Sequence, residues 1–184
     1  ERMLYDQLKR LEGYGVATAN TAEGSTTGMV GERSSIGYNG LGDVTTYHDQ
    51  QVKLGSTVME NIDWKGTYGV LGLVGTSDQA NHRTGQEILG GVVRLLDVTD
   101  TTRTHGMKYT RDGSNLRTYR ETLSSTASPD AVQLTAMDGA TYDIFGQVAT
   151  FKQRVDRVTA EAVGADGVID ESQAVLHSVT ETTR

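Results

Sequence analysis

The side chains that could hold a metal ion or move a proton are spread along this chain without a recognised spacing. No histidine has a second one four residues later, the spacing that places two ligands on one face of a helix. His48, with Asp49 beside it, and His105 are the best candidates for a site built from distant segments. An isolated histidine is most often a surface or half-buried side chain. The sequence therefore predicts no metal site and no metal requirement for folding. The histidines are His48, His82, His105 and His177.

Residues 164–171, G-A-D-G-V-I-D-E, are similar to the centre of a calcium-binding EF-hand loop. Placing the loop's invariant glycine on the second glycine of this stretch puts positions one, three and twelve at Ala162, Gly164 and Gln173. A calcium loop needs carboxylate oxygens at these positions, and none of the three residues has one. A turn is therefore the favoured interpretation.

Other glycine-rich stretches begin like nucleotide-binding or nucleophile-bearing turns. Residues 13–15 and 40–42 match the start of a dinucleotide fingerprint, but threonine stands at the sixth position of each. Neither stretch follows a predicted strand and opens a helix, as phosphate binding requires. Residues 24–28, G-S-T-T-G, have the glycine spacing of a nucleophile elbow but lack the strand before it. We therefore assign no catalytic residue and no cofactor.

Composition excludes several classes of chemistry and partner. The 184 residues contain no cysteine, so disulfides, thiolate catalysis and cysteine-ligated zinc are excluded. The formal net charge of −7 opposes binding to phosphate backbones, so no nucleic-acid partner is predicted. No apolar run approaches the roughly 18 residues of a membrane-spanning helix, so no membrane partner is predicted. A chain of this length can bury most of a core without a metal or disulfides.

The elements that must position any site are organised around residues 64–75, W-K-G-T-Y-G-V-L-G-L-V-G. Glycine recurs there every three residues, whereas strand side chains alternate with a period of two, so the glycines fall on both faces. We predict one buried, bulged strand over 67–74, with a close contact between subunits as the alternative. Trp64 is expected to be at least half buried beside this ladder. The ladder consists of Gly66, Gly69, Gly72 and Gly75.

A stripe of leucines near the N-terminus predicts a short helix over residues 1–12. Leu4, Leu8 and Leu11 follow the i, i+4, i+7 spacing of one helix face. Gly13 follows as the expected C-terminal cap. A helix this short is marginal alone, so its leucine stripe is expected to dock on another surface.

Three regions are expected along the chain. Residues 1–43 contain the helix and then a glycine-rich arm, which is poor in large apolar residues and is predicted to reach a neighbouring subunit. Residues 44–163 form the β core. Residues 164–184 form a C-terminal extension.

The expected fold class is mainly β, an antiparallel sandwich or barrel of short strands. Asp112-Gly113 and Asp138-Gly139 are typical of hairpin turns. Residues 147–180 are either a helix or a hairpin, and the hairpin is favoured because β-branched residues are dense there. The predicted strands are 44–54, 67–74, 91–98, 107–110, 116–123, 132–137 and 141–150.

The β core and the glycine-rich arm together resemble small virion proteins of tailed viruses, of the tail-tube, distal-tail or head–tail joining type. The resemblance implies a non-enzymatic structural protein that self-assembles as a homo-oligomer in the virion. Its implied partners are copies of itself and other structural proteins of the particle. The expected assembly interface consists of Leu4, Leu8, Leu11, Met29, Ile36, Tyr38, Leu41, Gly66, Gly69, Gly72 and Gly75.

Two alternatives of other classes are open. The first is a monomeric β-sandwich that binds carbohydrate or protein, with some of the eight tyrosines forming a platform for a sugar. The second is a hydrolase whose Asp, Glu and His residues come from distant segments. Either would be an extracellular or cytoplasmic soluble protein.

Overall fold

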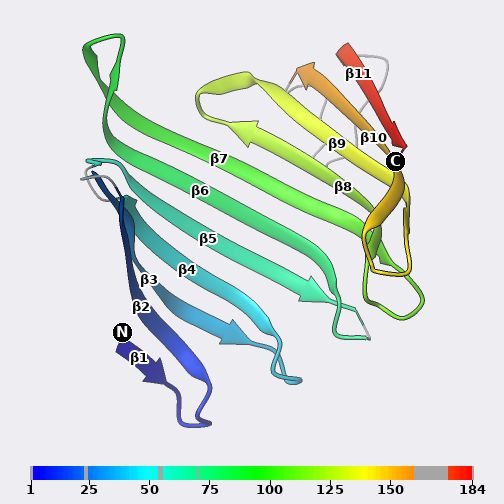
Figure 1. Ribbon diagram of the computed structural model, residues 1–184, viewed down its shortest axis with the longest axis horizontal. Helices are drawn as coiled ribbons and strands as arrows, with labels where there is room; N and C mark the ends of the chain where they lie inside the picture. Colours follow the sequence, from blue (N-terminus) through cyan, green and yellow to red (C-terminus); the bar gives the residue numbers. More distant parts are fainter. Residues whose placement is uncertain (1, 23–24, 54–55, 70, 160–173, 184) are drawn as a thin grey trace. The chain divides into compact units, whose positions relative to one another are not determined.

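The chain is built from antiparallel strands. The computed structural model describes residues 2–22, 25–53, 56–69, 71–159 and 174–183. Its strands follow the order of the chain, so that each strand pairs only with the strands before and after it (Figure 1). The strands are β1 Arg2–Tyr5, β2 Leu11–Ala22, β3 Ser25–Tyr38, β4 Val44–Lys53, β5 Met59–Tyr68, β6 Val74–Leu89, β7 Val92–Tyr109, β8 Leu116–Ser125, β9 Ser128–Tyr142, β10 Val148–Thr159 and β11 Ala174–Thr183.

The all-β class is confirmed, whereas the predicted sandwich or barrel is not. The described strands belong to one sheet, with β1 and β11 as its edge strands. The chain separates into two compact units. The first comprises residues 1–65 and 79–99, and the second comprises residues 66–78 and 100–184.

The helix predicted over residues 1–12 is wrong. This segment forms β1, a turn, and the start of β2, with Leu4 paired opposite Gly13. The Asp6 carboxylate accepts hydrogen bonds from the backbone N–H groups of Leu8 and Arg10, each at 2.8 Å. These bonds hold the chain in a tight turn, so the leucines lie on two strands and a turn tip rather than on one helix face.

The glycine-rich segment that we expected to be an irregular arm forms β2 and β3. The two strands pair from Tyr14 opposite Arg33 to Ala22 opposite Ser25. Glycine allows close packing here, because a Cβ on Gly13 would lie 2.7 Å from the carbonyl oxygen of Arg33. The small residues therefore serve strand pairing rather than disorder.

The glycine ladder is divided between two strands and the turn that joins them, so the single strand predicted over 67–74 is wrong. Gly66 is buried in β5 and Gly75 lies in β6. Gly69 and Gly72 belong to the turn, where the Gly72 N–H donates to the Gly69 carbonyl at 3.0 Å. Gly72 has a φ of 69°, a left-handed conformation that favours glycine.

The two Asp-Gly dipeptides have different outcomes. Asp112-Gly113 lies in the turn between β7 and β8, as predicted. Asp138-Gly139 lies inside β9, so the predicted hairpin turn there is wrong. Its partner strand β10 has one residue fewer over this stretch, and Gly139 has a φ of 62°. Gly139 is therefore at a β-bulge, for which the same left-handed glycine is suited.

The favoured C-terminal hairpin is matched by antiparallel pairing of β10 with β11, from Thr150 opposite Thr183 to Val158 opposite Ala174. The turn expected near residues 164–167 lies outside the described residues. The strand predicted over residues 141–150 is interrupted by a turn between β9 and β10.

The apolar core is small among the residues whose burial is described. Its members are Val132, Leu134, Ala140 and Val158, all on β9 and β10 of the second unit. Val132 and Val158 are direct neighbours across the two strands. The first unit has no comparable cluster in the described residues, so its stability depends largely on cross-strand bonds and on its turns. No helix in the described ranges has the length and apolar character needed to cross a membrane.

Candidate assembly surface

A tyrosine closes every second strand and opens a turn of the same construction. These tyrosines end β1, β3, β5, β7 and β9 and recur every 30 to 41 residues. The next strand begins six or seven residues after each tyrosine, with leucine or valine. The five segments are 5–11 Y-D-Q-L-K-R-L, 38–44 Y-N-G-L-G-D-V, 68–74 Y-G-V-L-G-L-V, 109–116 Y-T-R-D-G-S-N-L and 142–148 Y-D-I-F-G-Q-V.

The five turns share their backbone hydrogen bonds. In the first turn, the Asp6 N–H donates to the Arg10 carbonyl at 2.8 Å, and the Lys9 N–H donates to the Asp6 carbonyl at 3.0 Å. The equivalent pairs of bonds occur in the other four turns. The residue four positions after each tyrosine has a positive φ, which explains why it is glycine in four turns. These residues are Lys9 (61°), Gly42 (93°), Gly72 (69°), Gly113 (76°) and Gly146 (76°).

A side-chain oxygen directly after the tyrosine accepts from two backbone N–H groups in three of these turns, and in a fourth the Thr110 hydroxyl oxygen accepts from the Asn115 N–H at 3.1 Å. The Asn39 side-chain oxygen accepts from two backbone N–H groups at 2.9 Å, and Asp143 accepts from two at 2.8 and 2.9 Å. Asp6 accepts in the same way, and its bond from the Arg10 backbone N–H is the main reason that its pKa is lowered. Asparagine and aspartate are interchangeable in this role because only an acceptor oxygen is needed.

Three of the tyrosine hydroxyls fasten their turns to the preceding strand. Tyr38 donates to the Leu11 carbonyl at 2.6 Å, and Tyr109 donates to the Val74 carbonyl at 3.0 Å. Tyr142 donates in the same way to the carbonyl of Leu116. Each acceptor is the first residue of the strand before the tyrosine's own strand. The recurring contact therefore links one turn to the next within each unit.

The first tyrosine differs because β1 is an edge strand. The Tyr5 hydroxyl contacts only the Met3 sulfur, at 3.2 Å, and Tyr5 is 57% exposed. A further strand beside β1 could supply a carbonyl of the kind that Tyr38, Tyr109 and Tyr142 use.

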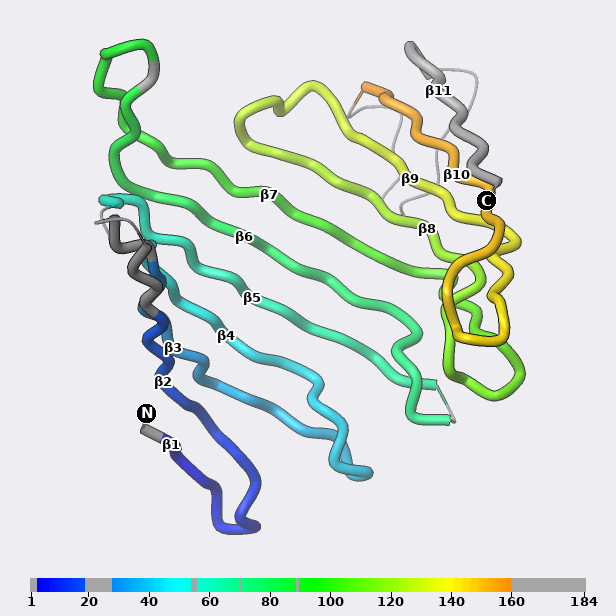
Figure 2. The backbone as a smooth tube through the Cα atoms, viewed as in Figure 1, coloured from blue at the N-terminus to red at the C-terminus, as the bar shows by residue number. Residues whose placement is uncertain are grey.

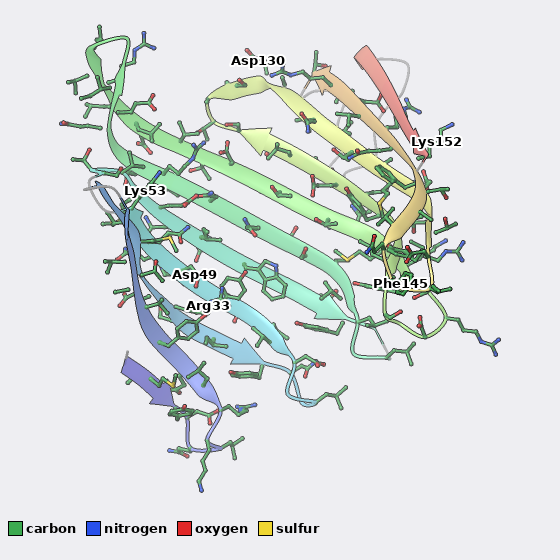
Figure 3. The ribbon with its side chains drawn as sticks, in the orientation of Figure 1. Arg33, Asp49, Lys53, Asp130, Phe145 and Lys152 are labelled. Atoms are coloured by element: carbon green, nitrogen blue, oxygen red, sulfur yellow. The ribbon has the colours of Figure 1, made fainter. Side chains whose placement is uncertain are left out.

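Four of the five turns present large apolar side chains at their tips. In the first unit, Leu8 and Leu41 are 73% and 81% exposed. In the second unit, Leu71, Ile144 and Phe145 are 73%, 93% and 81% exposed, and Figure 3 labels Phe145 in the turn between β9 and β10. We call these five residues the apolar turn tips. Turns usually carry polar residues at such positions, so exposed apolar side chains here depart from the common pattern.

The first unit also carries an arginine–aromatic stack that crosses three strands. Arg33 donates two hydrogen bonds to Asp49, each at 2.6 Å, and these side chains lie together on β3 and β4 (Figure 3). The guanidinium carbon lies 3.8 Å from the ring centroid of Tyr47. Tyr47 in turn stacks on Trp64 with centroids 5.2 Å apart and planes 12° apart.

This stack is used inside the sheet and does not form an open platform. Arg33 and Trp64 contact the Tyr47 ring from its two neighbouring strands, so Tyr47 is not available as a platform for a sugar. Partial burial is the main reason that the pKa of Tyr47 is raised. The hydrogen-bonded Asp49 raises the pKa of Arg33. Trp64 is partly buried, in agreement with the prediction, although its partner is Tyr47 rather than a glycine strand.

Two histidines form cross-strand pairs with aspartates. His48 Nδ1 lies 2.8 Å from Asp63 Oδ1, and His82 Nε2 lies 2.8 Å from Asp97 Oδ1. The Nδ1 atom of His105 is buried without a hydrogen-bond partner. Within the described part of the chain, no three metal-ligating side chains come together. The side chain of His177 lies outside the description.

A shallow trough crosses β2, β3 and β4 in the first unit. It encloses about 440 Å³ and has a mainly apolar lining, with polar groups from Glu32, Gln50 and Gln51. Gly15 and Gly31 form part of its floor. This trough is a place where a small molecule could lie, and it is the feature that bears on the binding-module alternative.

The residues predicted for the assembly interface fall into an exposed group, a partly buried group and the four glycines. The exposed members are Leu4, Leu8, Met29 and Leu41. The partly buried members are Leu11, Ile36 and Tyr38. The four glycines of the former ladder belong to strands and a turn, as described above.

Sequence reasoning missed the recurring turn, although a signal for it is present. A tyrosine followed four residues later by glycine occurs at Tyr38, Tyr68, Tyr109 and Tyr142. The irregular spacing between these positions hides the repetition. Leu71, Ile144 and Phe145 were missed for the same reason.

Comparisons with models of protein families, with curated proteins and with solved structures gave no match to this chain.

Proposed function

We propose that this chain is a non-enzymatic structural module that assembles with copies of itself and with other structural proteins. One observation carries the proposal: a turn with the same pair of backbone hydrogen bonds occurs five times along the chain, and four of the five present an exposed apolar side chain at the tip. The narrower form of the proposal is a tail or head–tail component of a tailed-virus particle. It rests only on the general resemblance of the β-rich and glycine-rich segments to such proteins.

The apolar turn tips are not needed to close their own turns. The Leu41 turn is closed by backbone bonds and by the side chain of Asn39, and the tyrosine hydroxyl fastens it to β2. An exposed leucine therefore adds no internal contact that a serine would lose. Its burial against a partner would contribute about 1.5–3 kcal/mol. The two tips of the first unit together could thus support a specific contact.

The polar side chains of the first unit are engaged in joining strands rather than in converging on one point. The Arg33–Asp49 pair and the two histidine–aspartate pairs each span neighbouring strands. In the histidine pairs, the carboxylates of Asp63 and Asp97 are 71% and 82% exposed. A general base usually works in an enclosed site, so these pairs favour a structural role.

The test is the mass of the full chain in solution as a function of concentration, compared between two matched variants. One variant carries Leu8→Ser and Leu41→Ser. The control carries Gln7→Ser and Gly40→Ser, which introduce the same residue at exposed positions of the same two turns.

The wild type and the control should form species above the 19.8 kDa of one chain, as measured by light scattering. The leucine variant should assemble only at a concentration at least about tenfold higher, because a loss of about 1.4 kcal/mol corresponds to that factor. A wild type that stays monomeric at its highest soluble concentration, with or without added salt, would refute the proposal.

A monomeric binding module is the second candidate because of the trough across β2, β3 and β4. Its volume of about 440 Å³ falls in the range of small-molecule sites, about 300–1,000 Å³. A monomeric wild type whose melting temperature rises with a carbohydrate ligand would favour this candidate. Gly15→Leu should then abolish the rise by filling the trough floor.

A further inference from the structure

The hairpin of β6 and β7 in the first unit carries exposed apolar residues on both strands. Its turn, Gly90-Gly91, has φ angles of 59° and 82°, which are those of a two-residue type I′ turn. The hairpin continues past the ends of β4 and β5 (Figure 2). Its exposed apolar residues are Ile88 (74%), Val92 (58%), Val93 (59%) and Leu95 (85%).

The first part of β7 has an open edge. The neighbours of β7 in the sheet are β6 and β8, and the pairing with β8 begins at Asp100. Residues 92–98 therefore pair on the β6 side only. Along the other side, no strand among the described residues pairs with the alternate backbone N–H and C=O groups of this stretch.

This edge lacks most of the features that protect natural edge strands. It contains no proline or lysine, and no residue in it has a positive φ that would mark a bulge. Arg94 and Asp97 are its only charged residues. An open edge with exposed valine and leucine is a template for pairing with another strand.

The edge of β6 is better covered. The Thr57 hydroxyl donates to the Gln86 carbonyl at 2.9 Å, and the backbone of residues 57–58 packs closely on Gly85. The outer edge of β7 is thus the longer open edge of this hairpin.

We propose that the edge formed by residues 92–98 pairs antiparallel with the same edge of a second copy of this chain, with Leu95 opposite Leu95. This inference rests on the proposed structural function and names one of its contacts. The edge favours a second copy of the chain as its partner, because in one register it can pair with an identical strand without placing like charges opposite each other.

Symmetry limits the registers to those centred on a single residue. Two identical antiparallel strands in one sheet are related by a two-fold axis perpendicular to it, so opposed residues must belong to the same face. A register centred on Arg94 would place two guanidinium groups opposite each other, which is destabilising. A register centred on Leu96 would place Leu95 opposite Asp97 in both halves.

The register centred on Leu95 avoids the like-charge contact, and within residues 92–98 it has more apolar pairs than the register centred on Leu96, whose only apolar pair is Leu96 opposite itself. It places Leu95 opposite Leu95, and Val92 opposite Val98 in both halves. Arg94 then lies opposite Leu96, and Val93 opposite Asp97, so no charge faces a like charge. Apolar pairs thus occupy the centre and both ends of the paired stretch.

The absence of cysteine in the chain allows a direct test by cross-linking. Leu95→Cys is prepared in the full chain and exposed to mild oxidation, and covalent dimer is measured on a denaturing gel. Arg94→Cys and Leu96→Cys are matched controls on the same edge. A disulfide requires Cα atoms within about 7 Å, and in the proposed register only position 95 faces itself at such a distance.

Leu95→Cys should form covalent dimer at least about tenfold faster than either control, because only its thiols meet within the range of a disulfide. In addition, Leu95→Lys should reduce the assembly measured by light scattering, and Leu95→Met should not. Leu95 is 85% exposed, so neither change should unfold the chain.

The outcomes separate this inference from the proposed function. If the wild type assembles, but cysteine at 94 or 96 cross-links as fast as at 95, the pairing is wrong and the structural function stands. The same conclusion follows if the wild type assembles and Leu95→Lys has no effect. If the wild type is monomeric and no cysteine variant cross-links, both proposals are wrong.

Discussion

Replacing Tyr38 with phenylalanine tests whether the tyrosine hydroxyls stabilise the sheet. The Tyr38 hydroxyl donates a 2.6 Å hydrogen bond to the Leu11 carbonyl of the preceding strand, and both residues are partly buried. Phenylalanine keeps the ring and its contact with Arg10, whose guanidinium carbon lies 4.8 Å from the ring centroid. The substitution therefore removes the hydrogen bond and little else.

The expected loss in the free energy of unfolding is about 1–2 kcal/mol. A hydrogen bond contributes about 0.5–1.5 kcal/mol net, and a buried acceptor left unpaired costs about 1–3 kcal/mol. The Leu11 carbonyl is only partly buried, which places the estimate near the middle of these ranges. Urea unfolding monitored by circular dichroism gives this free energy, provided that the slope with urea is unchanged.

Tyr5→Phe is the matched control. Its hydroxyl contacts only the Met3 sulfur and the residue is 57% exposed, so its loss should change stability by less than about 0.5 kcal/mol. Equal effects of the two substitutions would refute the argument, because the carbonyl contact would then contribute nothing.

The other predictions concern the turns and one close backbone contact. Lys9→Gly should stabilise the protein by about 0.5 kcal/mol in urea unfolding. A lysine in the left-handed conformation costs about 1–2 kcal/mol, and the greater conformational freedom of glycine in the unfolded chain offsets part of that gain. A loss of stability would contradict the turn geometry. Gly85→Ala should destabilise by about 3 kcal/mol or more, whereas Gly40→Ala should change stability by less than about 0.5 kcal/mol. A Cβ at Gly85 would lie 2.9 Å from the Cα of Val58 and still closer to a carbonyl oxygen, whereas a Cβ at Gly40 would meet nothing within 4 Å. Similar effects of the two substitutions would show that the close contact between Gly85 and residues 57–58 is absent. Hydrogen bonds from Thr110 and Ser114 lower the pKa of Asp112 to about 2. The Asp112 carboxylate therefore adds to the free energy of unfolding at pH values above the unfolded-state pKa of about 3.9, and this addition is lost as the pH falls toward 2. The stability difference between wild type and Asp112→Ala in urea unfolding should shrink over that window, and a difference that stays constant would contradict the pKa shift.

The β class could be predicted from sequence because it depends on local composition. β-branched residues and turn dipeptides indicated strands over most of residues 44–160, and the turn at Asp112-Gly113 was placed correctly. The dipeptide Asp138-Gly139 shows the limit of that signal. A left-handed glycine suits a turn and a bulge equally, and only the pairing with β10 decides between them.

The errors near the N-terminus have a related cause. The spacing of Leu4, Leu8 and Leu11 fits one helix face, but it also fits a strand, a turn tip and a second strand. The deciding interactions are the hydrogen bonds that the Asp6 carboxylate accepts from the backbone N–H groups of Leu8 and Arg10 within the turn. The apolar spacing of a short segment does not decide between a helix and two strands joined by a turn.

The candidate surface was predictable only in part. Leu8 and Leu41 were chosen from sequence and are exposed turn tips in the structure. Their equivalents in the second unit required knowledge of the turn, because the tyrosine–glycine spacing is constant while the distance between turns is not. The hydroxyl contact of Tyr38 joins residues that are 27 positions apart, which no local pattern reveals.

The most direct test of the structural function is the mass of the unmodified full chain, measured by light scattering over a range of concentrations. The structural function predicts that the mass rises above 19.8 kDa with concentration and that substitution of Leu8 and Leu41 by serine suppresses the rise. A mass that stays at one chain throughout, or a rise that the two substitutions leave unchanged, would contradict it.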